Sequence, residues 1–231
     1  MRTPHARAPK QDRSRQSFER MLDAAGEILA KDGVAALTLA AVSRRSKVSI
    51  GSIYCRVDSK GDLLRALHAR IRDRMDLEFG AAMNRLRRKQ LPLIELVPAL
   101  VRELANFHRR HAPALGAFIE LGATDEVIRK VGKKHYLQIA MDFRILLLER
   151  RAEFSHPAPQ RAADACFSVI YGTLARFLGL GGSQDAVGEG DWRLLLEDLS
   201  TMMAAFLMAD LAAPPGPPDR LPFKPDQLHS N

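Results

Sequence analysis

Short polar side chains at positions 49–54, followed by a lysine at position 60, have the chemistry of a DNA contact. Ser49, Gly51 and Ser52 are small enough to let the start of a helix enter the major groove, which is about 12 Å wide. The first turn of such a helix offers free backbone N–H groups and a positive dipole end to phosphate. Tyr54 can donate a hydrogen bond to the same phosphates, and Lys60 can reach them from the next helix. This pattern indicates a base-reading helix flanked by phosphate contacts.

Basic residues extend the expected DNA-contacting surface beyond positions 49–60. Arg44, Arg45 and Lys47 would border the groove, although an ordinary solvated face is the alternative. Ile50 points either to a thymine methyl group or to solvent, whereas Ile53 is expected in the core. The candidate DNA contacts are Thr38, Arg44, Arg45, Lys47, Ser49, Ile50, Gly51, Ser52, Tyr54, Arg56 and Lys60.

Aromatic, methionine and histidine side chains in the second half of the chain could line a ligand pocket. Individually each is more often plain core, but together they indicate an apolar pocket with few fixed polar groups. His108 and His111 lie three residues apart, and without a third ligand at helical spacing we predict neither a metal site nor a cofactor. The candidate pocket residues are Phe107, His108, His111, Phe118, Tyr136, Met141, Phe143, Phe167 and Tyr171.

The two cysteines, Cys55 and Cys166, lie far apart and form no C-x-x-C pair. Neither a disulfide framework nor a structural zinc site is therefore expected. A redox switch at Cys55 is the alternative, but nothing nearby except Arg56 would activate its thiol. We predict that each cysteine is a small, buried or half-buried hydrophobic residue.

Positive charge is concentrated in the first ninety residues. The net charge is +8; residues 1–64 carry 12 Lys and Arg against 7 Asp and Glu, and residues 65–90 carry 8 against 3. The remaining residues carry 15 against 17. Such a distribution favours phosphate binding, because neutralised phosphates release their counterions, while a solubilising surface is the alternative.

Helices must hold the DNA contacts in place. Apolar residues at three- and four-residue spacing predict a first helix that ends at Asp32-Gly33, where glycine suits a left-handed closing position. Thr38 is the expected N-cap of a short helix at 39–46, with a phosphate contact as an addition, and Ser49 is that of a second at 50–55. Two short helices around a tight turn make a helix-turn-helix.

The rest of the chain also reads as helical. Ser59 and Asp62 approach a capping box that starts a long helix to about residue 88, which can connect two bodies of the protein mechanically. Strand-like alternation and internal repeats are absent from the sequence pattern. Further helical segments are expected at 93–110, 113–121, 125–151, 159–180 and 191–211, with a flexible loop at 181–190.

We therefore predict an all-α fold, with an N-terminal three-helix helix-turn-helix domain joined by a long helix to a helical ligand-binding and dimerisation domain. No apolar run approaches the roughly 20 residues of a membrane span, and the first 15 residues lack an apolar stretch, so we expect a cytoplasmic protein. The expected boundaries are 1–13 for a flexible basic arm, 14–67 for the DNA-binding domain, 68–212 for the sensing and dimerisation domain, and 213–231 for a disordered proline-rich tail.

Several separated motifs over residues 14–67 resemble the opening of TetR-family repressors, in the right order and spacing. The motifs are Arg20-Met21-Leu22-Asp23-Ala24-Ala25, Asp32-Gly33, Leu37-Thr38-Leu39, Val48-Ser49-Ile50-Gly51-Ser52-Ile53-Tyr54 and Ser59-Lys60-Gly61-Asp62-Leu63-Leu64. The remaining two thirds of the chain resemble the family only in the number and order of helices. The resemblance implies a homodimer, a palindromic DNA site and a ligand pocket inside the second domain.

This chain departs from the family pattern at three positions. Lys47 stands where the family usually has glycine, at a cost of about 1–2 kcal/mol if the residue is left-handed. Arg56 and Val57 replace the usual histidine and phenylalanine; the arginine keeps a phosphate donor, and the valine shrinks an apolar plug. We expect DNA binding to be retained and the operator to be unusual.

The function expected from the sequence is a ligand-responsive repressor that binds a palindromic operator as a homodimer. An apolar or aromatic effector would release it, and the apolar helices at 159–180 and 191–211 would form the dimer. One alternative is an enzyme that carries a basic helical domain, although no phosphate loop or catalytic spacing is found. The other is a protein that binds a membrane surface through the basic helix at 65–90.

Overall fold

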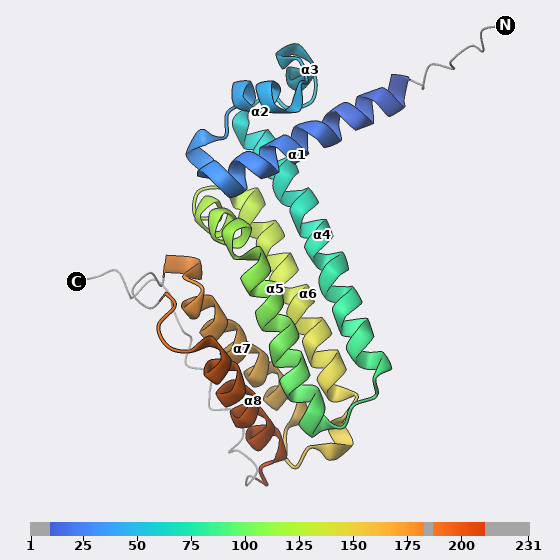
Figure 1. Cartoon of the computed structure of the whole chain (residues 1–231). Coiled ribbons are helices and arrows are strands. Elements are labelled where there is room, and N and C mark those ends of the chain that lie inside the picture. Colours follow the sequence, from blue (N-terminus) through green and yellow to red (C-terminus); the bar gives the residue numbers. More distant parts are fainter. Residues whose placement is uncertain (1–9, 183–186, 211–231) are drawn as a thin grey trace, which may run out of the picture.

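The computed structural model describes residues 10–182 and 187–210, and every regular element in those ranges is a helix. Figure 1 shows α1–α3 gathered at one end, the long α4 leading away from them beside α5 and α6, and α7 and α8 on the other side of α5. The helices are α1 (Lys10–Ala36), α2 (Leu39–Ser46), α3 (Ile50–Tyr54), α4 (Lys60–Arg88), α5 (Leu93–Gly122), α6 (Glu126–Leu148), α7 (Pro159–Phe177) and α8 (Trp192–Met208), with short 3-10 helices η1 (Arg151–Glu153) and η2 (Leu180–Gly182). The predicted all-α fold is confirmed.

The expected flexible segments coincide only partly with the described residues. The arm expected at 1–13 overlaps α1, which begins at Lys10, because no helix breaker interrupts its polar first turns. Within that stretch the Ser17 hydroxyl donates to the carbonyl of Arg13 at 2.7 Å. The rest of the arm, part of the loop expected at 181–190 and the proline-rich tail lie outside the described residues.

The first core packs α1–α3 against the start of α4. Its α1 stripe follows the predicted spacing, and α1 breaks at Gly33. The φ of 77° and ψ of −179° at Gly33 lie in a region open to glycine rather than in the left-handed helical conformation expected there. Phe118 from α5 and Ile128 from α6 belong to the same core. Its other buried members are Met21, Leu22, Ala24, Ala25, Ile28, Leu29, Leu37, Val42, Val48, Ile53, Val57, Leu63, Leu64 and Leu67.

α5 is one helix where the sequence predicts two. The segments expected to meet near residue 111 form a continuous helix that contains Pro98 and Pro113. A proline inside a helix removes one backbone hydrogen bond and costs about 3 kcal/mol. Leu104 and Leu115, before and after Pro113, are both buried in the bundle core. Burial of this continuous apolar face offsets the cost of the proline. Local sequence signals do not reveal this burial, because it depends on the packing of the other helices.

The second core fills the bundle of α4–α8 and shares α4 with the first. Met75, Phe79 and Met83 on α4 are buried in it, and α4 runs unbroken across the boundary expected between residues 67 and 68. α4 is therefore a rigid connection between the helix-turn-helix and the bundle.

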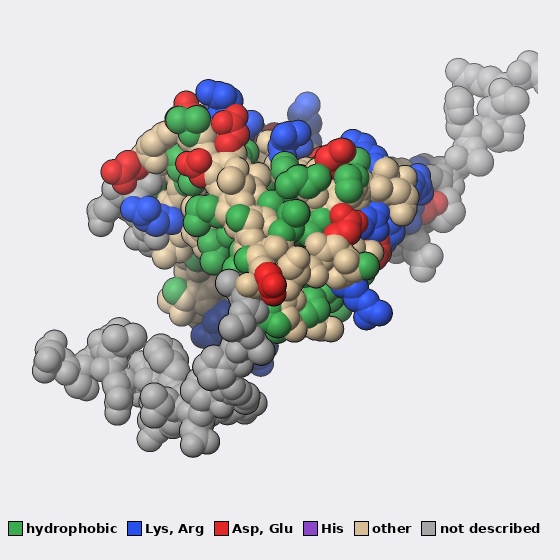
Figure 2. Space-filling view, turned by 90° about the horizontal axis from the view of Figure 1, so that it is seen from below, with side chains coloured by type: hydrophobic (Ala, Val, Ile, Leu, Met, Phe, Trp, Pro, Cys, Tyr) green, Lys and Arg blue, Asp and Glu red, His purple; other side chains and the backbone are tan. Residues whose placement is uncertain are grey.

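The end of the bundle away from α1–α3 has mixed character. Figure 2 shows hydrophobic side chains across the middle of this end and charged side chains of both signs mostly toward its borders. Among the helices that the structure describes, none combines the length and the apolar content that a membrane crossing requires.

Candidate nucleic-acid interface and internal cavity

Short-range hydrogen bonds build the turn between α2 and α3. Thr38 caps α2, since its Oγ1 accepts from the N–H of Ala41 at 3.1 Å. Lys47 then adopts the left-handed conformation, with φ 56° and ψ 27°. The Ser43 hydroxyl donates to the carbonyl of Val48 at 2.7 Å and closes the turn. The predicted cap is confirmed, and a lysine occupies a conformation that favours glycine.

α3 is a short helix held by its own cap and by one buried side chain. The hydroxyl of Ser49 accepts from the N–H of Ser52 at 3.2 Å, and the two hydroxyls lie 2.8 Å apart. Ile53 is fully buried in the first core, as predicted. The cap and this single anchor fix the orientation of the helix.

The outer face of α3 is open. Ile50 and Tyr54 are exposed, and a Cβ added at Gly51 would meet nothing within 4 Å. The Ile50 side chain therefore points outward, as both a contact with a thymine methyl group and exposure to solvent require. Small or accessible side chains on this face would let the helix approach base edges in a major groove.

The basic candidates on α2 differ in their surroundings. Arg44 and Lys47 are exposed beside the turn. Arg45 forms an ion pair with Glu27 of α1 at 3.0 Å, and both side chains are largely exposed. An exposed ion pair of this kind contributes at most about 1 kcal/mol, so phosphate can compete for Arg45.

Lys60 and Arg56 make bonds within the domain that the sequence did not predict. The Lys60 ammonium donates to the carbonyl of Val34 at 2.7 Å. Arg56 donates to the carbonyl of Ser14 and to its hydroxyl, the latter at 2.6 Å, and lies 5.4 Å from the ring centre of Phe18. Both basic residues therefore also hold the helix-turn-helix against α1.

Cys55 is exposed, so the prediction that its thiol is buried is wrong. α3 is only five residues long, and Ile53 takes its inward position. Cys166 is buried in the bundle core as predicted, and burial raises the pKa of its thiol to about 12.

A cavity of about 340 Å³ lies between α4, α5 and α6, with α7 closing one side. Most of its wall is aliphatic or aromatic. The exposed residues Ala123 and Arg129 lie at its border. Its volume is near the lower end of the range of about 300–1,000 Å³ that is usual for small-molecule pockets.

Five of the nine candidate pocket residues line this cavity: Phe107, His108, Phe118, Tyr136 and Tyr171. They come from α5, α6 and α7. The rings of all except Phe118 contact one another in a chain, and the centroids of Tyr136 and Tyr171, for example, are 4.9 Å apart. The tertiary structure thus gathers residues that are up to 64 positions apart in the sequence.

The other four candidates lie elsewhere. His111 Nε2 is 2.9 Å from the carboxylate of Glu78, and Met141 is exposed on the outside of α6. Phe143 and Phe167 are buried in the bundle core with ring centres 5.5 Å apart. Residue type alone did not separate these positions, because which side of a helix faces the cavity depends on how the helices pack.

The cavity also contains polar residues that the sequence reasoning missed. His68 and Arg72 reach it from α4, and His135 from α6. A signal was present, because His68 and Arg72 lie four residues apart and interrupt the apolar face of α4 between Leu64 and Met75. Polar residues on the inward face of a helix indicate a binding pocket more strongly than aromatic residues do, because aromatic residues are common in any core.

Arg72 is only 6% exposed, and its Nε donates to His68 Nε2 at 3.0 Å. Burial, followed by the nearby Arg72 charge, lowers the pKa of His68 to about 4, so this imidazole is neutral and accepts the bond. His108 donates from Nδ1 to the carbonyl of Leu104 at 2.8 Å, and burial lowers its pKa to about 4. Arg72 therefore places a buried positive charge in the wall of an otherwise largely apolar pocket.

His135 adds another buried polar group. Its Nδ1 is hydrogen-bonded to Asp76, while its Nε2 is buried and has no hydrogen-bond partner among the described residues. Burial and then Arg72 lower the pKa of His135, against the opposing effect of Asp76. Within the described ranges, no three His, Cys, Asp or Glu side chains are placed to hold a metal ion.

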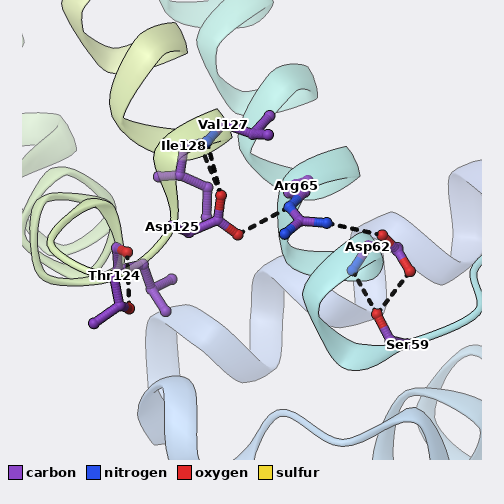
Figure 3. A network of polar contacts seen from close by, with 8 residues as sticks. Ser59, Asp62, Arg65, Thr124, Asp125, Val127 and Ile128 are labelled. Atoms are coloured by element: carbon purple, nitrogen blue, oxygen red, sulfur yellow. Dashed lines mark hydrogen bonds and ion pairs between the residues drawn. The ribbon is translucent and has the colours of Figure 1, made fainter.

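An arginine links the start of α4 to the start of α6. Figure 3 shows Arg65 between two carboxylates: its Nη1 donates to Asp62 at 3.1 Å, and its Nε donates to Asp125 at 2.9 Å. Asp62 is bonded to the cap of α4, Ser59, and Asp125 caps α6 by accepting from the N–H groups of Val127 and Ile128. The network therefore joins the helix that leaves the helix-turn-helix to a helix that lines the cavity.

Residues 21–67 match the family described as bacterial regulatory proteins, tetR family. The match covers α2, α3, their turn and the capped start of α4, which is the geometry described above. Residues 21–67 therefore form a TetR-family N-terminal domain.

Solved structures share the same fold over most of the chain. A protein from Mesorhizobium loti assigned to TetR-family transcriptional regulators matches with a TM-score of 0.68 at 13% identity, covering 84% of this chain and 96% of that one. The fatty acid degradation regulator FadR from Bacillus halodurans matches with a TM-score of 0.55 at 17% identity, over 87% and 97% of the two chains. FadR from Bacillus subtilis, solved in complex with stearoyl-CoA, matches with a TM-score of 0.57 at 18% identity, over 84% and 100%.

At these identities the solved structures show the fold of this chain and not its ligand. No curated protein matches the chain by sequence. The predicted resemblance of the first domain to the TetR family and the predicted fold class are confirmed.

Proposed function

We propose that the chain is a homodimeric transcriptional repressor that binds a palindromic operator through α2 and α3 and is released by a small molecule in the cavity. The proposal rests mainly on Phe118 and Ile128, because these two side chains line the cavity and also belong to the core beneath the helix-turn-helix. A ligand that moves these side chains changes the support of α2 and α3 directly. The known complex of Bacillus subtilis FadR with stearoyl-CoA supports a ligand role for the fold.

α4 supplies the mechanical part of the mechanism. Its first residue, Lys60, is bonded to α1, and Arg72 on the same helix lies in the cavity wall. Twelve residues of α-helix separate them, which is about 18 Å. Effector binding releases DNA only if the effector binds the DNA-incompetent arrangement more tightly. We propose domain limits of 14–67 and 68–212 with α4 crossing between them, and a cytoplasmic location, where the DNA is.

The dimer proposal rests on fewer side chains than the sequence suggested. Many apolar residues of the two helices expected to form the dimer, including Cys166 and Ile170, are buried in the subunit's own core. Val169 on α7 and Leu194 and Met202 on α8 are exposed. They leave an apolar surface that a second copy would cover, as in a four-helix bundle. Light scattering at micromolar concentration should give twice the chain mass, and a monomer would end the dimer proposal.

The alternative that the protein binds a membrane surface through the helix at 65–90 lacks an exposed apolar face in this fold. A peripheral helix needs an exposed apolar face. In the helix 65–90 that face is occupied, because Leu67, Met75, Phe79 and Leu86 are all buried.

The test of DNA recognition uses a duplex selected from a random library with the full chain, set beside a scrambled duplex. Gly51→Leu places a side chain where nothing lies within 4 Å, so folding should be unchanged while binding to the selected duplex falls at least about tenfold. Gly80→Leu, on α4 with equally open surroundings, is the matched control and should bind normally. Equal affinity for both duplexes in the wild-type chain would overturn the proposed function.

A further inference from the structure

The cavity has one feature that an apolar ligand would not use. Arg72 is 94% buried, and in the described part of the chain no carboxylate forms an ion pair with it. Its hydrogen bonds go from Nε to the neutral His68 and, at 4.0 Å, from Nη1 to the sulfur of Met75, which is a weak acceptor. Burial lowers the pKa of Arg72 against the opposing effects of Tyr171 and Asp76, and the guanidinium stays charged at neutral pH. A buried cation normally has an anionic partner.

The space beside the guanidinium is open toward α6. Gly132 faces it, and a Cβ built there would lie 4.0 Å from Arg72 Nη2 with no other atom nearby. His135, one turn further along α6, is 5% exposed, and its Nε2 has no hydrogen-bond partner among the described residues. The buried His135 Nε2 without a partner and Arg72 Nη2, which makes no hydrogen bond with the described residues, therefore both belong to the lining of one cavity that is otherwise largely apolar.

We propose that the cavity binds a small carboxylic acid with an apolar body, and that Arg72 holds its carboxylate beside Gly132. The guanidinium offers parallel N–H donors that match a carboxylate, and the aromatic and aliphatic walls enclose the apolar part. This inference rests on the proposed function, because it names the class of effector for the same cavity. The cavity volume of about 340 Å³ also limits the ligand to a compact acid.

Calorimetric titration of the full chain without DNA tests the ligand class. The probes are 2-naphthoate and decanoate, each beside its neutral amide of nearly the same shape. At least one acid should bind about tenfold or more tightly than its amide, as a charge-assisted hydrogen bond implies. Equal binding of acid and amide, or no binding of either acid up to about 1 mM, would overturn the proposal.

Two variants locate the carboxylate. Arg72→Met keeps the length and apolar stem of the side chain and should abolish the preference for acid over amide. Arg85→Met, which replaces an exposed arginine on the same helix, is the matched control and should leave the preference intact.

Because removal of a buried arginine can disturb folding, Gly132→Leu provides an independent test. The leucine fills the space beside Arg72 and favours the helix, so stability should hold while acid binding is lost. Acid selectivity that survives in both variants would place the carboxylate elsewhere.

A last titration repeats the acid in the presence of the selected DNA duplex. If the acid binds selectively but leaves DNA affinity unchanged, the ligand class stands and the proposed release mechanism fails. If the amide binds as tightly as the acid and also releases DNA, the mechanism stands and the ligand class fails.

Discussion

The imidazole of His68 on α4 lies against the ring of Phe118 on α5, with centroids 4.3 Å apart and planes tilted by 36°. Both rings line the cavity, and Phe118 also belongs to the core of the helix-turn-helix domain. His68 is in turn bonded to Arg72. This tilted pair therefore forms a direct route of contacts between Arg72 in the cavity wall and the core beneath α2 and α3.

Phe118→Ala should lower stability by about 3–5 kcal/mol and also weaken DNA binding, because it opens the core beneath α2 and α3. Phe143→Ala is the matched control, since each ring is 2% exposed but Phe143 lies only in the bundle core. It should cost similar stability and leave the DNA affinity of the folded protein unchanged. Urea unfolding and DNA titration measure the two effects, and equal DNA affinities for the two variants would disprove the proposed route.

Arg65→Gln should weaken the coupling between ligand and DNA while leaving ligand affinity nearly unchanged. Arg65 joins α4 to the cap of α6, as Figure 3 shows, yet its side chain is 43% exposed, so its ion pairs contribute at most about 1 kcal/mol to stability. The measurement is the ratio of DNA affinities with and without ligand, which is typically about 5–150 in coupled systems. Arg144→Gln, which breaks the similarly exposed pair with Asp164, should keep the full ratio. A ratio that is the same in both variants would remove Arg65 from the mechanism.

Substitutions of Lys47 should change stability and the salt dependence of DNA binding separately. Lys47→Gly relieves the left-handed conformation at φ 56°, and Lys47→Ala does not, so the glycine variant should be about 1 kcal/mol more stable than the alanine variant. Both variants remove a charge from the proposed phosphate contact, so the slope of log affinity against log salt should fall by about one unit in each. An unchanged slope would mean that Lys47 does not reach a phosphate.

Stability should fall as the pH is lowered from about 6.5 toward 4. The folded-state pKa values of His68 and His108 are lowered to about 4, so the unfolded chain binds more protons in this window and is favoured by acid. Above about pH 7 both states are neutral at these rings and their contribution is fully present. The limiting loss is on the order of 3 kcal/mol for each histidine.

Thermal and urea unfolding at several pH values between 7.5 and 4 measure this effect. His108→Gln retains a donor for the carbonyl of Leu104 and removes one titrating ring, so its stability should depend less steeply on pH. An equally steep dependence in the variant would show that His108 does not contribute.

Local chemistry determined the helix-turn-helix in the sequence itself. Thr38, Ser49 and Ser59 each accept a backbone N–H bond three residues ahead, and such caps are visible as residue type and spacing. The match of residues 21–67 to the TetR family follows the same local signals. The break of α1 at Gly33 was equally predictable, because its cause is the conformational freedom of one residue.

Packing decided what local signals could not. Pro113 continues a helix only because the apolar face of α5 is buried on both sides of it. The cavity draws its walls from α4, α5, α6 and α7, so its residues depend on how those helices turn against one another. The sequence predicted Phe107 and Tyr171 there from their type, but it also predicted Met141, which faces outward, and it missed Arg72. Caps and turns arise from bonds between near neighbours in the chain, whereas a cavity and a buried charge arise from long-range packing that no short segment contains.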